Sequence, residues 1–218
     1  MNWGEAARIL ALGLPNTVVI TLGAFAIGLV LGLPLALARL SRWSALNGPA
    51  TIFIEIVRGI PPLAWIFVTF YGVGKVVGRL DPVFTAIASL GFVAIAYMAE
   101  IYRAALQSVS PGQLAAGRAI GLGDGSVLVH ILLPQAAVLA IPSAATYCIG
   151  LLKESALASV IGAGEITYRA MLLTDRTLHG LDVFAIAAVL YVALSVPLAI
   201  FARWAGRRFG AHFRRRTA

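Results

Sequence analysis

The chain has 218 residues, of which 60% are hydrophobic and only 12% are charged, and its mean hydropathy is +0.91. Because a soluble domain is usually about half apolar and about a quarter charged, this composition excludes an ordinary soluble protein and indicates several membrane spans. The net charge of +8 comes largely from arginines near the C-terminus. Such arginines anchor a membrane protein on its cytoplasmic side, so nucleic-acid binding is not expected.

Apolar segments long enough to cross a membrane, which takes about 20 residues each, recur along the whole chain. The sequence therefore predicts an all-α, polytopic membrane protein with about five transmembrane helices. The single cysteine, Cys148, is expected to be a small buried residue of the fourth span. The five predicted spans cover residues 18–37, 60–77, 83–106, 134–152 and 184–204.

Glycines and prolines punctuate these spans. Gly28 and Gly32 form a small-residue ridge that suits close helix contact, although a glycine-rich span without a partner would show the same pattern. Asn47-Gly48-Pro49 is expected to break the chain after the first span, and a short surface helix is expected over 50–57. Pro61-Pro62 prevents regular backbone bonding at the start of the second span, and interrupted helices often mark transport sites.

The distribution of lysine and arginine predicts the orientation. An odd number of spans puts the termini on opposite sides, and positive charge gathers in the cytoplasm. With the N-terminus outside and the C-terminus inside, six basic residues lie outside: Arg8, Lys75, Arg79, Lys153, Arg169 and Arg176. Eleven lie inside: Arg39, Arg42, Arg58, Arg103, Arg118, Arg203, Arg207, Arg208, Arg214, Arg215 and Arg216.

The loop between the third and fourth spans has the signals of a short helix. Ser110 and Gln113 form a capping box around Pro111, which suits the first helical position. Gly121 is a natural left-handed end for a helix over 111–120, and Asp124 is expected to cap a second short helix. Composition alone leaves two possibilities for the first helix: it lies on lipid, or it docks into a cytoplasmic partner.

The spacing in this loop resembles the cytoplasmic "EAA" loop of permease subunits of bacterial ABC importers. The family pattern is Glu-Ala-Ala, three residues, Gly, nine residues, Ile, one residue, Leu-Pro. Here it falls on Ala115-Ala116-Gly117, Gly121, Ile131 and Leu133-Pro134, with alanine in place of the usual glutamate. The resemblance implies that the loop is a coupling helix that meets an ATPase subunit. The residues expected at this contact are Gln113, Ala115, Ala116, Gly117, Arg118, Gly121 and Leu122.

Further stretches resemble the polar amino acid branch of these permeases. They are Thr21-Leu22 with Gly28 and Gly32, residues 36–42, Arg58-Gly59-Ile60-Pro61-Pro62-Leu63, residues 96–103 and residues 151–157. The resemblance as a whole covers about 14–204. The resemblance implies one transmembrane domain of the type I importer kind over 1–218, with a basic cytoplasmic tail over 205–218. It also implies a bacterial inner-membrane location, two ATPase subunits, a second permease chain and an external solute-binding protein. The residues expected to contact the solute are Glu100, Glu154, Ser155, Tyr97, Pro61 and Leu63.

Glu100 and Glu154 each have two interpretations. A charged side chain in an apolar span is costly, by at least about 2.5–3.5 kcal/mol when unpaired. Glu100 could pair with Arg103 at helical i, i+3 spacing, and Glu154 could pair with Lys153 or lie exposed at the outer edge. Alternatively, both carboxylates line a cavity and meet a polar or cationic solute.

The sequence contains no Walker-type phosphate-binding loop, and its three histidines lack metal-ligand spacing. The chain is therefore expected to have neither ATPase activity nor a cofactor of its own, so an uphill transporter of this kind would use ATP on partner subunits. The alternative is a stand-alone secondary carrier or channel in which Glu100 and Glu154 pass an ion or solute.

Overall fold

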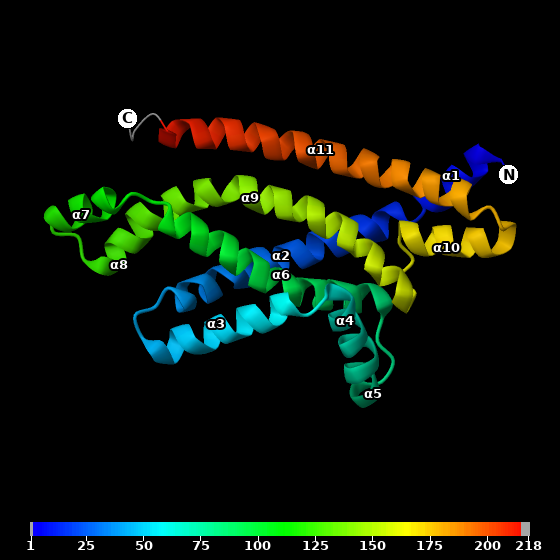
Figure 1. The fold of residues 1–218 in the computed structure, drawn as a ribbon, viewed down its shortest axis with the longest axis horizontal. Helices are drawn as coiled ribbons and strands as arrows, with labels where there is room; N and C mark the ends of the chain where they lie inside the picture. The colour runs from blue at the N-terminus through cyan, green and yellow to red at the C-terminus, as the bar shows by residue number, and fades with distance from the viewer. Residues whose placement is uncertain (1, 215–218) are drawn as a thin grey trace.

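The computed structural model describes residues 2–214, which are almost entirely helical. Figure 1 shows an elongated molecule in which α2, α6, α9 and α11 run along the long axis. The helices in chain order are α1 (Trp3–Ala11), α2 (Leu14–Arg39), α3 (Ser44–Gly59), α4 (Pro62–Phe67), α5 (Gly74–Val77), α6 (Pro82–Gln107), α7 (Pro111–Ala119), α8 (Asp124–Val127), α9 (Leu133–Glu154), α10 (Ile166–Thr177) and α11 (Gly180–Arg214). Short π-helical turns lie at Val68–Val73 and Leu128–Leu132, and a 3-10 helix covers Ser155–Ile161.

Four helical stretches within residues 2–214 are long and apolar enough to span a membrane: Trp3–Arg39, Pro82–Gln107, Asp124–Ile161 and Gly180–Arg208. A fifth is formed if Ser44–Gly59 and Pro62–Val77, which bend by 98° at Pro61, count as one broken span. This confirms the predicted all-α fold with about five spans. The predicted basic tail at 205–218 begins inside α11, while Arg215 and Arg216 lie outside the described residues.

The chain turns earlier after the first span than the sequence predicted. Residues 40–43 form the link, and α3 then runs through Asn47-Gly48-Pro49 without a break, so the prediction of a break there was wrong. Side-chain bonds hold this stretch helical: the Asn47 amide donates to the Ser41 carbonyl at 3.4 Å and accepts from the Thr51 hydroxyl at 3.0 Å. The predicted surface helix over 50–57 is therefore the second half of a longer helix.

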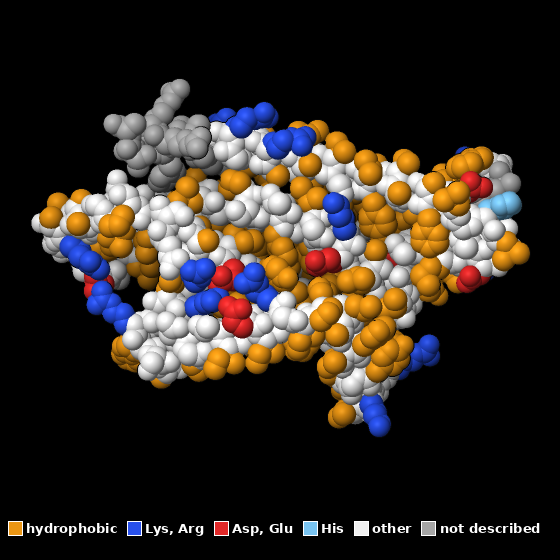
Figure 2. Space-filling model, in the orientation of Figure 1, with side chains coloured by type: hydrophobic (Ala, Val, Ile, Leu, Met, Phe, Trp, Pro, Cys, Tyr) orange, Lys and Arg blue, Asp and Glu red, His pale blue; other side chains and the backbone are white. Residues whose placement is uncertain are grey.

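The two ends of the molecule differ. Helices α7 and α8 lie at the same end of the molecule as the C-terminal part of α11, and α1 and α10 lie at the other end (Figure 1). Hydrophobic side chains are spread over the whole visible face, and a group of adjoining basic and acidic side chains lies beside α3 (Figure 2). Exposed apolar side chains such as Val189, Val192 and Ile200 follow α11, as expected for a helix that faces lipid.

Gly28 and Gly32 lie on the face of α2 that packs against α6, so the predicted ridge has a partner. A Cβ atom at Gly28 would lie 2.8 Å from the Ala94 Cβ, and one at Gly32 would lie 2.7 Å from the Met98 Cβ. Both distances are far inside van der Waals contact, so only glycine lets the two helices approach this closely.

We expect Gly28→Val to separate α2 from α6 and to lower the free energy of unfolding by about 1–3 kcal/mol, as overpacking usually does. Gly48→Val is the matched control, because Gly48 is also helical but a Cβ there has no atom within 4 Å. Thermal unfolding of the purified protein measures both. Equal melting temperatures for Gly28→Val and the wild type would contradict the close α2–α6 contact.

Candidate functional site

The loop helix α7 matches the sequence prediction closely. It begins at Pro111, ends at Ala119, and is followed by Gly121 in the left-handed region with φ of 85°. The predicted capping box at Ser110 is absent. The Ser110 side chain makes no capping hydrogen bond, and the Gln113 N–H donates to the Ser110 carbonyl at 3.0 Å instead. Asp124 does not cap α8 either; it is the first helical residue, and its carboxylate pairs with Arg118 at 3.0 Å.

Most of the predicted coupling residues are exposed at the tip of the molecule. Gln113, Ala115, Ala116, Arg118 and Gly121 are exposed, and Leu122 is half-buried. Gly117 is buried instead, since a Cβ there would lie 2.5 Å from the Ile131 Cδ1 atom. Gly117 therefore lets α7 rest on Ile131, so two elements of the loop pattern meet as a packing contact.

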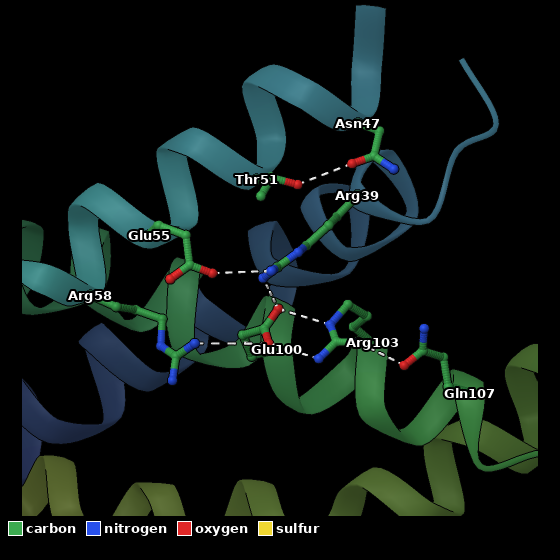
Figure 3. Close-up of polar contacts among 8 residues, drawn as sticks. All are labelled: Arg39, Asn47, Thr51, Glu55, Arg58, Glu100, Arg103 and Gln107. Carbon is green, nitrogen blue, oxygen red and sulfur yellow. Dashed lines mark hydrogen bonds and ion pairs between the residues drawn. The ribbon is translucent and has the colours of Figure 1, made fainter. Parts of the chain in front are cut away.

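Glu100 on α6 is surrounded by three arginines (Figure 3). Arg103 approaches it with two bonds of 3.0 Å, which confirms the i, i+3 pair, and Arg39 at the end of α2 donates to the same Oε1 atom. The Arg58 Nη1 atom lies 3.8 Å from Oε2, and Arg39 also binds Glu55 at 3.1 Å. The cluster thus joins α2, α3 and α6, and its arginines neutralise the charge of a carboxylate that lies within a membrane-spanning helix.

Beside this cluster, aromatic side chains lead toward Glu154. Arg58 lies over the Tyr97 ring, with its Cζ atom 5.1 Å from the ring centroid. Tyr97 stacks on Tyr147 of α9, with ring centroids 5.3 Å apart and an interplanar angle of 15°. Tyr147 precedes Glu154 by two helical turns on α9, so the two residues share one face of that helix.

Two buried polar atoms in this region have no hydrogen-bond partner among residues 2–214: the Tyr147 hydroxyl and the Glu154 Oε2. Within residues 2–214, Glu154 makes no ion pair with the exposed Lys153. Buried polar atoms are nearly always satisfied, so these two are the candidate contacts for a polar ligand, for water or for a partner chain.

The remaining predicted solute residues lie around the break in the second span. Ser155 is fully buried and its hydroxyl donates to the Leu152 carbonyl at 2.7 Å. Pro61 is exposed at the bend before α4, and Leu63 is half-buried in α4, which packs against α6 and the Ser155–Ile161 turn. The structure thus places Tyr97 next to the Glu100 cluster, through its contact with Arg58. Ser155, Pro61 and Leu63 lie in or next to segments that pack against α6.

Two residues of this polar interior, Tyr147 and Glu165, are absent from the sequence predictions. The Glu165 carboxylate is fully buried and accepts from the Tyr191 hydroxyl at 2.6 Å and from two backbone N–H groups at the start of α10. Burial raises the pKa of the Glu165 carboxyl group above its ordinary value. Glutamate is not a usual N-cap residue, so no sequence signal identifies it, whereas the i, i+7 spacing to Glu154 could have identified Tyr147.

The chain is similar to known transport proteins over most of its length. The family model "Binding-protein-dependent transport system inner membrane component" matches residues 28–211. The chain is 32% identical to the probable glutamine ABC transporter permease protein GlnM of Bacillus subtilis (strain 168), over 90% of this chain and 91% of that protein. It is 34% identical to the L-cystine transport system permease protein TcyL of the same organism, over 94% and 89%.

Chains of solved ABC transporter structures superpose closely on this chain. A chain of an amino acid ABC transporter crystallised with histidines superposes with a TM-score of 0.87 at 28% identity, covering 94% of this chain and 95% of that one. A chain of the MetNI methionine ABC transporter gives a TM-score of 0.82 at 23% identity, over 93% and 96%, and supports the fold alone. Members of this family are permease subunits of ABC importers, in which separate subunits hydrolyse ATP. With the family match and these relatives covering most of its length, the chain belongs to the binding-protein-dependent transport system inner membrane components.

Proposed function

We propose that this chain is the permease subunit of an ATP-driven importer that moves a polar amino acid across the bacterial inner membrane. The observation that carries the solute class is the unpaired Glu154 carboxylate oxygen, buried near the Tyr97–Tyr147 stack. A free ammonium group is a good partner for a buried carboxylate, because the charge-assisted hydrogen bond is roughly twice as strong as a neutral one. The relatives named for glutamine and cystine transport support the same class.

Two cytoplasmic ATPase subunits would each hold one α7 helix, one from this chain and one from a second permease chain. Exposed Gln113, Ala115, Ala116 and Arg118 would form the contact, and Gly117, Gly121 and Leu122 would shape it. An external solute-binding protein would deliver the amino acid to the end that carries α1 and α10. ATP-driven closure of the ATPases would push α7 and thereby shift α6 and α9, the helices that it connects.

The orientation proposed for this chain is N-terminus outside and C-terminus inside. Eleven basic residues would then face the cytoplasm and six the outside. The placement of α1 and of the end of α11 at opposite ends of the molecule (Figure 1) is compatible with it.

The solute path proposed here follows Glu154, Tyr97 and Glu100 along α9 and α6. Ser155, Pro61 and Leu63 would shape its walls around the broken span. Glu100 differs from Glu154, because its carboxylate is already bound by arginines. Its contribution to the path is therefore expected to depend on those arginines.

Reconstitution in liposomes tests the proposed function against the stand-alone carrier. We expect uptake of glutamine, arginine or cystine to require the ATPase subunits, internal ATP and the binding protein, and to persist when ion gradients are collapsed by ionophores. Family membership favours this outcome. Gradient-driven uptake by the permease chain alone would instead establish the secondary carrier.

A further inference from the structure

Arg58 is the least engaged arginine of the Glu100 cluster. Its side chain is 35% exposed, compared with 16% for Arg39 and 29% for Arg103. Its one ion-pair contact, to Glu100, is long at 3.8 Å, and its guanidinium makes no side-chain hydrogen bond within residues 2–214. Most of its donors are therefore available to another acceptor.

The charges of the cluster do not balance. Three guanidinium groups face two carboxylates, and the Glu55 carboxylate is 60% exposed and binds Arg39 only. Glu100 already accepts hydrogen bonds from Arg39 and Arg103 on its two oxygens. The positive charge left over lies at Arg58, where an anion would be attracted.

Arg58 also lies next to the proposed solute path. It ends α3 just before the bend at Pro61, and its guanidinium covers the Tyr97 ring that stacks on Tyr147. The distance of 5.1 Å from its Cζ atom to the ring centroid is within the range of a cation–π contact, which restrains the guanidinium. A planar, oriented guanidinium binds a carboxylate with two parallel hydrogen bonds.

We propose that Arg58 binds the carboxylate of the transported amino acid, and that Glu100 is a positioning residue that keeps Arg58 in place. Glu154 would contact the solute at a different point of the path, because the Tyr97–Tyr147 pair lies between the two residues and the ammonium and carboxylate groups of an amino acid share one carbon atom. This inference rests on the proposed function and adds the requirement that the solute carry a free carboxylate.

The test measures binding to the permease–ATPase complex in nanodiscs without the binding protein, so that the latter's own specificity does not enter. The probes are L-arginine and L-glutamine, each compared with its α-carboxamide. We expect the wild-type complex to bind at least one acid at least about tenfold more tightly than its amide, because the charge-assisted pair is lost in the amide. Arg58→Gln should bring acid and amide to nearly equal affinity, and Arg58→Lys should restore part of the difference.

Arg42→Gln is the control, since Arg42 lies in the neighbouring link, is exposed, and has no ion pair within the described residues. It should keep the wild-type acid-to-amide ratio. If Arg58→Gln does not assemble, Arg58→Lys provides the test, and a wild-type acid-to-amide ratio in that variant contradicts the proposal. So do equal binding of acid and amide by the wild type, equally strong competition by chloride or phosphate, and no binding of any probe at millimolar concentration.

Failure of this inference is distinguishable from failure of the proposed function. Uptake that requires ATPase subunits, together with equal binding of acid and amide, removes the role of Arg58 and leaves the importer. Uptake by the permease chain alone removes the importer, whatever the acid-to-amide ratio.

Discussion

Replacing Glu154 by Gln is expected to lower ATP-driven uptake per assembled complex at least tenfold, which corresponds to about 1.4 kcal/mol. The amide keeps the shape of the side chain and removes its charge, so a bound ammonium group loses its strongest partner. The buried Oε2 has no hydrogen-bond partner within residues 2–214, so the cost of burying charge at this oxygen is not compensated when no solute is bound. The melting temperature of Glu154→Gln should therefore equal or exceed that of the wild type, while uptake falls.

Two further variants isolate this effect. Glu5→Gln changes an exposed carboxylate on α1 and should leave uptake unchanged. Glu100→Gln removes the charge that holds three arginines, so it should reduce the amount of folded complex, because breaking a partly buried ion cluster leaves unpaired charge. Initial rates in liposomes, divided by the amount of complex, measure all three. Wild-type uptake and affinity in Glu154→Gln would exclude Glu154 from the solute site.

The fold could be predicted because its signals are local. Each span is an apolar run of the length that a membrane requires, and the expected ends at 37, 106 and 152 lie within a few residues of the ends of α2, α6 and α9. The turn at Gly121 also follows from a few neighbouring residues. The break after the first span was misplaced because side-chain bonds of Asn47 outweigh the turn preference of Asn-Gly-Pro.

The candidate site could be predicted only where its contacts are local. The i, i+3 spacing reveals Arg103 as a partner of Glu100, but Arg39 comes from another helix, 61 residues away in sequence. Tyr191 likewise reaches Glu165 across 26 residues. Contacts of this kind depend on how α2, α3 and α6, or α10 and α11, pack together, and no spacing rule in one sequence encodes that packing.

Gly121→Val is expected to uncouple ATP hydrolysis from transport. Gly121 has φ of 85°, a conformation that costs a residue with a side chain roughly 1–2 kcal/mol, and more for a β-branched one. A Cβ at this position would have no atom within 4 Å, so the effect arises from the backbone and not from crowding. The strained turn should release the end of α7, so that the helix no longer transmits ATPase closure to α6 and α9.

The measurement is the ratio of solute taken up to ATP hydrolysed in liposomes, and we expect this ratio to fall in Gly121→Val while the chain still inserts and assembles. Gly121→Asn should retain more coupling, because asparagine tolerates the left-handed region. Gly123→Val is the matched control: Gly123 has an ordinary extended conformation with φ of −68° and equally open surroundings. Ala115→Glu, at an exposed position of α7, should be tolerated. Because Gly121 and Gly123 differ chiefly in the sign of φ, a wild-type ratio in Gly121→Val would show that the left-handed turn is not needed for coupling and that α7 does not act as a rigid lever.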